Sequence, residues 1–77
     1  MIDYTYYFFK HVKYDKSNFS RFKNEMIAIG ELIFRGHTSF TYCHPNPHEL
    51  EFIELIDGNG FRVKEDNNTY IITIAYN

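Results

Sequence analysis

The hydrophobic and polar residues of this chain first predict a strand and then a helix. Residues 2–9 are aromatic or β-branched at most positions, which is typical of a strand. Between residues 18 and 35, apolar residues recur at steps of three and four, which predicts a helix. Ser17 is a suitable N-cap, Gly36 a suitable stop, and Gly30 allows a close backbone contact inside the helix. The apolar stripe consists of Phe19, Phe22, Met26, Ile29 and Ile33.

A second strand follows the helix. Residues 37–43 alternate with period two, so we expect a strand whose Phe40 and Tyr42 point toward the core. Pro45 and Pro47 then end this strand, because proline cannot donate to a sheet ladder.

The end of the chain predicts a β-hairpin. Residues 61–65 and 69–76 have strand patterns, and the polar residues 66–68 between them are turn formers. Along the last strand, Tyr70 and Ile72 share one face, whereas Ile71 belongs to the other.

Residues 47–57 have two interpretations. Asn46, Pro47 and Glu49 resemble a capping box, and Gly58 follows as a stop, which favours a helix. The alternative is a strand over residues 50–56 that enters a hairpin through the Asp-Gly and Asn-Gly pairs after it. The helix is the preferred interpretation, because strand alternation breaks in the middle of the segment.

These elements predict one α+β domain over residues 1–77, in the order β-α-β-α-β-β. The expected architecture is a two-layer sandwich, with a four-stranded sheet and two helices on one face, because each helix offers only one apolar stripe. The alternative is one helix on an antiparallel five-stranded sheet. One face of the four-stranded sheet would be open to solvent or to a partner.

From Gly36 to residue 77, the arrangement resembles the small sulfur-carrier proteins of the TusA/SirA family. The shared features are a glycine before a strand, a proline-containing turn at 45–47, a short helix, Gly60 and a terminal hairpin. The family's carrier cysteine lies in a Cys-Pro-x-Pro motif at the start of the first helix, but residues 16–19 contain no cysteine. The resemblance therefore implies a topology, and a sulfur-handling role is a weaker alternative.

Composition and charge narrow the classes of protein. The net charge is −2, and residues 1–36 carry +2 (six Lys/Arg against four Asp/Glu). Residues 37–77 carry −4, from two Lys/Arg against six Asp/Glu. The single cysteine, Cys43, excludes an internal disulfide and fits a reducing compartment, so we expect a cytoplasmic protein. No apolar run is long enough for a membrane span, and the N-terminus lacks the pattern of a signal peptide.

An aromatic and basic surface is the best candidate binding site. If the helices cover one face of the sheet, Tyr7 and Phe9 should stand on the other, beside Arg62, Lys64 and Ile71. Exposed aromatics flanked by arginine are typical of protein interfaces. The sequence therefore predicts a protein-binding domain whose partner is another protein or, in a homodimer, a second copy.

The same surface has an alternative interpretation. Lys10, Lys13 and Lys16 form a basic stretch next to the aromatic residues, which also suits a small single-stranded nucleic-acid-binding protein. The acidic second half makes protein contact the preferred interpretation. Many residues have AT-rich codons, so an inhibitor or adaptor of a phage or mobile element is a special case.

The sequence contains no convincing catalytic, metal or cofactor motif. Cys43, His44, His48 and His37 are ligand types for zinc, but their spacing is unusual and the turn should be exposed. Cys43 has no base placed to activate it. We therefore expect a non-enzymatic protein without cofactor or metal.

Overall fold

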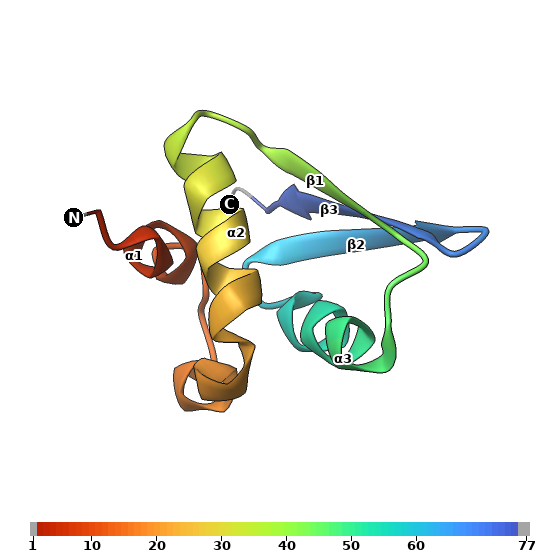
Figure 1. Cartoon of the computed structure of the whole chain (residues 1–77), viewed down its shortest axis with the longest axis horizontal. Coiled ribbons are helices and arrows are strands. Elements are labelled where there is room, and N and C mark those ends of the chain that lie inside the picture. The colour runs from red at the N-terminus through yellow and green to blue at the C-terminus, as the bar shows by residue number, and fades with distance from the viewer. Residues whose placement is uncertain (1, 76–77) are drawn as a thin grey trace.

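The computed structural model describes residues 2–75 and has an α+β fold. Helices cover one face of an antiparallel sheet, whose strand order is β1-β3-β2 (Figure 1). The elements are α1 (Tyr4–Phe9), the 3₁₀ helix η1 (Lys16–Phe22), α2 (Lys23–Phe34), β1 (Ser39–Cys43), α3 (Pro47–Ile56), β2 (Phe61–Asp66) and β3 (Thr69–Ile74). Within residues 2–75 the sheet has three strands, so the predicted four-stranded sheet and its five-stranded alternative are both wrong.

The missing strand is the N-terminal segment 2–9, because Tyr4–Phe9 of this segment form helix α1 and not a strand. Asp3 caps this helix, and its Oδ1 accepts hydrogen bonds from the Thr5 N–H at 3.2 Å and the Thr5 hydroxyl at 2.6 Å. Aromatic residues occupy both sides of the helix, so the sequence shows no helical periodicity. In this helix Phe8 is fully buried, while Tyr6 on another side is 59% exposed. The burial of Phe8 in the core is the tertiary contact that outweighs the strand preference of these aromatic residues.

Phe8 lies at the centre of the aromatic core. Its ring stacks on Phe61 of β2 at a centroid distance of 5.5 Å and on Phe52 of α3 at 5.7 Å. It also meets the edge of Phe19 from η1 at 5.4 Å. One ring of the N-terminal helix thus joins the layer of helices to the sheet.

The predicted helix over residues 18–35 is confirmed in its second part, where α2 runs from Lys23 to Phe34. Its first part forms η1, and the expected N-cap Ser17 lies inside that 3₁₀ helix. The predicted stop at Gly36 is confirmed, since this residue has a φ of 96°. The Gly36 N–H donates to the Ile33 carbonyl at 2.9 Å and the His37 N–H to the Leu32 carbonyl at 3.0 Å, as in a Schellman motif.

Helix α3 confirms the capping-box prediction, and the alternative strand over residues 50–56 is wrong. The Asn46 side chain accepts a hydrogen bond from the Glu49 N–H at 2.8 Å, and the Glu49 carboxylate accepts one from the Asn46 N–H at 2.9 Å. Pro47 occupies the first turn, where its missing N–H costs nothing.

The predicted strand over residues 37–43 and the terminal hairpin are confirmed as β1, β2 and β3, while Tyr76 lies outside the described residues. Asn67 and Asn68 have φ values of 53° and 64°, as a two-residue type I′ turn requires. The covered face of the sheet carries Phe40, Tyr42, Phe61, Val63, Tyr70, Ile72 and Ile74. The other face, called the open face below, carries Ser39, Thr41, Cys43, Arg62, Lys64, Asp66, Thr69, Ile71 and Thr73.

A buried asparagine holds the segment after α1 against the loop before β2. The Asn59 side chain accepts hydrogen bonds from the N–H groups of Lys13 at 3.0 Å and Tyr14 at 2.6 Å. Its amide also donates to the Tyr14 carbonyl at 2.8 Å. Gly60 lies directly against the His11 carbonyl, where any side chain would overlap the backbone.

The close backbone contact that the sequence predicts at Gly30 is confirmed, and its partner is the backbone of α1. A Cβ atom at this position would overlap the Tyr4 carbonyl oxygen. In an exposed helix, Gly→Ala would add about 1 kcal/mol of stability. Here we expect Gly30→Ala to lower the free energy of unfolding by about 1–3 kcal/mol, because the backbone of α1 must move. Urea denaturation measures this change, and a stabilising effect would contradict the packing of α1 on α2.

Candidate functional site

Three of the predicted binding residues lie together on the open face. Register pairs Lys64 with Ile71, and Arg62 with Thr73 one row further along. Ile71 is 38% exposed, and both cations are exposed. The sequence predicted this common face, because alternate residues of a strand point to the same side of the sheet.

The other two predicted binding residues, Tyr7 and Phe9, do not lie on the open face. They belong to α1 and are half-buried, so the predicted placement of these rings on the sheet is wrong. Phe9 packs at 5.6 Å from Phe8 and 6.1 Å from Phe19, which makes it part of the rim of the core. Among the described residues, the open face carries no aromatic ring.

Tyr7 instead belongs to an aromatic cluster on α1 and the end of α2. Its ring lies 5.1 Å from Phe34 and 5.3 Å from Tyr6. The Lys10 ammonium lies over Tyr6 and Tyr7 at 5.6 and 5.9 Å from their centroids. The predicted basic residues are exposed, Lys13 in the segment after α1 and Lys16 at the start of η1. This cluster therefore places Lys10 near aromatic rings but away from the sheet.

The cysteine and histidines of the sequence do not gather into a metal centre. Within residues 2–75, no three His, Cys, Asp or Glu side chains lie close enough to hold a metal ion. Cys43 is exposed on the open face. His48 stacks on Phe22 at 4.7 Å, and its Nε2 lies 3.6 Å from Glu25 Oε1.

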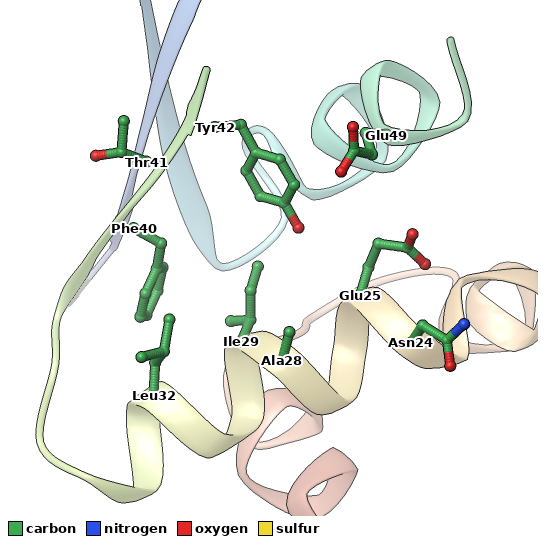
Figure 2. A pocket seen from close by; sticks show the side chains of 9 residues that line it. All are labelled: Asn24, Glu25, Ala28, Ile29, Leu32, Phe40, Thr41, Tyr42 and Glu49. Carbon is green, nitrogen blue, oxygen red and sulfur yellow. The ribbon is translucent and has the colours of Figure 1, made fainter. Parts of the chain in front are cut away.

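A groove that the sequence analysis missed lies between α2 and β1 and has a volume of about 390 Å³ (Figure 2). Phe40 and Tyr42 point from β1 toward α2, whereas the Thr41 side chain points away from α2 (Figure 2). One end of the groove is apolar, and the other contains carboxylates. The residues that line it are Asn24, Glu25, Ala28, Ile29, Leu32, Phe40, Thr41, Tyr42 and Glu49.

The acidic end of the groove surrounds the Tyr42 phenol. Burial raises the pKa of Tyr42 to about 12, and the charges of Glu25 and Glu49 contribute further to this increase. Among the described residues that line the groove, two are carboxylates and none is a lysine or an arginine. The groove thus has a negative electrostatic potential at one end.

The outer edge of β1 has unpaired backbone groups. The Ile74 N–H donates to the Thr38 carbonyl at 3.0 Å, and the His44 N–H to the Asn68 carbonyl at 2.8 Å. In an antiparallel ladder, every second residue of a strand bonds to a given neighbouring strand. The backbone N–H and C=O groups of the even-numbered residues of β1 therefore point toward β3. The N–H and C=O groups of Ser39, Thr41 and Cys43 therefore point outward. No hydrogen bond within residues 2–75 occupies them.

The groove runs along this free edge. Of the sheet strands, only β1 contributes to its lining, and β1 is an edge strand. Thr41 lines the groove although its side chain points away from α2, which places the Thr41 backbone at the rim (Figure 2). An extended chain beside β1 would therefore reach both the unpaired backbone groups and the groove.

The opposite edge of the sheet, along β2, is covered. The Gly58 N–H donates to the Phe61 carbonyl at 2.8 Å, and the Val63 N–H donates to Asp57 Oδ1 at 3.2 Å. Glu65 and Asp66 add charge to the end of β2. In contrast, β1 has no charged residue or proline, the usual devices that protect an edge strand from pairing.

Comparisons of the chain with protein-family models, curated proteins and solved structures gave no match. The resemblance to the TusA/SirA family, the reactive-cysteine alternative and the phage or mobile-element origin therefore stay predictions. None of the helices in residues 2–75 combines the length and apolar character that a bilayer crossing requires.

The placement of Phe9 and Tyr6 predicts effects of different size on stability. Phe9→Ala should lower the free energy of unfolding by about 2 kcal/mol, because it removes ring contacts with Phe8 and Phe19. Tyr6→Ala is the matched control and should change it by less than about 0.5 kcal/mol, because Tyr6 is 59% exposed. Thermal and urea unfolding measure both changes, and equal effects would contradict the described orientation of α1.

The groove also predicts a measurable titration. The Tyr42 phenol should ionise near pH 12, which ¹³Cζ NMR detects, and Glu25→Gln should lower this pKa because it removes a nearby negative charge. Since the folded pKa lies above the ordinary value of 10.0, the corresponding stability is present below pH 10 and is lost as the pH rises toward 12. Glu54→Gln, on the exposed side of α3, is the control. A Tyr42 pKa that does not respond to Glu25→Gln would contradict the arrangement.

Proposed function

We propose that this chain is a protein-binding domain that accepts an extended segment of its partner at the outer edge of β1. The observation that carries this proposal is the unpaired row of backbone groups on Ser39, Thr41 and Cys43, beside an open groove. Strand addition to an exposed sheet edge is a general mode of peptide recognition, in which main-chain hydrogen bonds provide affinity and pockets provide specificity.

The contrast between the two edges supports strand addition at β1. Asp57 and Gly58 occupy two outward groups of β2, the Val63 N–H and the Phe61 carbonyl, whereas the five residues of β1 carry strand-forming side chains and no charge. A free edge of this kind is a hazard for aggregation unless another chain pairs with it. Binding a partner would therefore satisfy groups that the folded chain leaves to solvent.

The nucleic-acid alternative depended on aromatic rings at the open face of the sheet. Base stacking on a sheet needs aromatic rings on the open face, and the described part of that face has none. On α1, Lys10 already lies over the Tyr6 and Tyr7 rings. Protein binding is therefore the function that the geometry supports best, and nucleic-acid binding stays an alternative prediction.

Thr41→Pro tests the proposal, because it removes only an outward N–H of β1. Proline is tolerated on an edge strand when its nitrogen faces solvent, so pairing with β3 should persist. We expect peptides selected from a random linear library to bind the wild-type chain with a Kd in the micromolar range. Thr41→Pro should weaken this binding at least tenfold. Calorimetry with the selected peptides measures both affinities.

Thr41→Ala is the matched control, because it keeps the N–H and changes only the side chain on the open face. This variant should bind as the wild type does, and bound peptide should protect the Ser39, Thr41 and Cys43 amides from hydrogen exchange. Peptides that bind Thr41→Pro as tightly as the wild type, or that protect amides of α1 instead, would contradict strand addition at β1.

A further inference from the structure

We propose that the segment bound at β1 runs antiparallel to it and contains a lysine or arginine, any one residue, and then an aliphatic residue. The basic residue would lie opposite Tyr42 and the aliphatic residue opposite Phe40. This inference rests on the proposed function, since it requires that a strand be added at β1. It goes further because it names the chemistry of the partner.

Strand geometry decides which side chains of the added segment enter the groove. Residues directly opposite each other on neighbouring strands point to the same face of the sheet. The residues opposite Phe40 and Tyr42 therefore point toward α2, into the groove (Figure 2). The residue between them, opposite Thr41, points to the open face, where Ser39, Thr41 and Cys43 are small and uncharged. That middle position should accept most side chains.

The apolar end of the groove selects the aliphatic residue. Leu32 of α2 faces Phe40 across the groove (Figure 2), and Leu32 and its groove-lining neighbour Ala28 are both exposed. An aliphatic side chain opposite Phe40 would remove this apolar surface from water, which stabilises the complex.

The acidic end selects the basic residue. Glu25 of α2 and Glu49 of α3 both lie near the Tyr42 hydroxyl (Figure 2), and the Glu25 side chain is only 16% exposed. The nearest group of opposite charge type is the His48 imidazole, 3.6 Å from Glu25. A lysine or arginine opposite Tyr42 would bring a permanent positive charge between two carboxylates. Charge complementarity of this kind contributes specificity at interfaces.

The order of the two residues follows from antiparallel pairing. Because Tyr42 follows Phe40 on β1, an antiparallel partner meets Tyr42 first and Phe40 two residues later. The basic residue therefore precedes the aliphatic one. Antiparallel pairing is also slightly more stable per residue than parallel pairing.

A second copy of this chain fits the groove less well than a basic segment. In two-fold pairing centred on Thr41, Phe40 of the second copy would lie opposite Tyr42. Its ring would enter the acidic end, and β1 has no lysine or arginine to contribute. Self-association would bring no lysine or arginine to the Glu25 and Glu49 carboxylates.

The test uses three acetylated and amidated peptides with the full-length chain. They have the sequences Thr-Thr-Lys-Thr-Ile-Thr-Thr, the reversed order Thr-Thr-Ile-Thr-Lys-Thr-Thr, and Thr-Thr-Glu-Thr-Ile-Thr-Thr. NMR titration measures each Kd and locates binding through the Ser39, Thr41 and Cys43 amides. We expect the first peptide to bind on the order of tenfold more tightly than either of the others.

A charge exchange connects this preference to Glu25. In Glu25→Lys, the preference should reverse, so that the glutamate peptide binds more tightly than the lysine peptide. Glu54→Lys changes the net charge equally at an exposed position of α3 outside the groove, and it should keep the wild-type preference.

Each other outcome overturns the inference. Equal affinities, tighter binding of the reversed peptide, or no binding of the first peptide at about 1 mM would exclude the proposed motif. Dimers in sedimentation experiments that Thr41→Pro dissociates would show that a second copy occupies the edge. The proposed function fails separately, if library peptides bind Thr41→Pro as tightly as the wild type or protect amides of α1 instead.

Discussion

The insertion of Phe8 into the core is the contact on which the rest of the structure depends. Its ring touches Phe19, Phe52 and Phe61, so it links η1, α3 and β2 through one side chain. A chain of this length has a small core, and no other residue of α1 is fully buried. To place this ring, α1 must approach the backbone of α2 at Gly30. The N-terminal segment is therefore held by the core and cannot extend the sheet.

The candidate site is a consequence of the same arrangement. Because the N-terminal segment is a helix, no additional strand within residues 2–75 covers β1, and the outward groups of that strand stay accessible. The Gly36 turn at the end of α2 leads the chain directly into β1, and the two elements form the walls of the groove (Figure 2). If residues 2–9 had formed the strand that the sequence predicted, the sheet would have had a fourth strand, and that strand could have paired with β1.

Local signals in the sequence were sufficient for much of the fold. The capping box before α3, the glycine stop after α2 and the asparagine turn each involve residues that are close in the chain. Parity along β2 and β3 also placed Arg62, Lys64 and Ile71 on one face. The N-terminal helix and the groove depend on distant contacts and on strand order, for which the sequence has no local signal. The structure shows that Asp3 caps this helix, and the surrounding aromatic residues hid the helical periodicity in the sequence.

The covering of β2 by Asp57 and Gly58 has a consequence for assembly. A sheet with two accessible sides can recruit molecules in series and polymerise into fibres. In this sheet the Phe61 carbonyl and the Val63 N–H on the β2 side are already bonded, so a guest strand finds its row of unpaired backbone groups at β1. The complex should therefore have one-to-one stoichiometry.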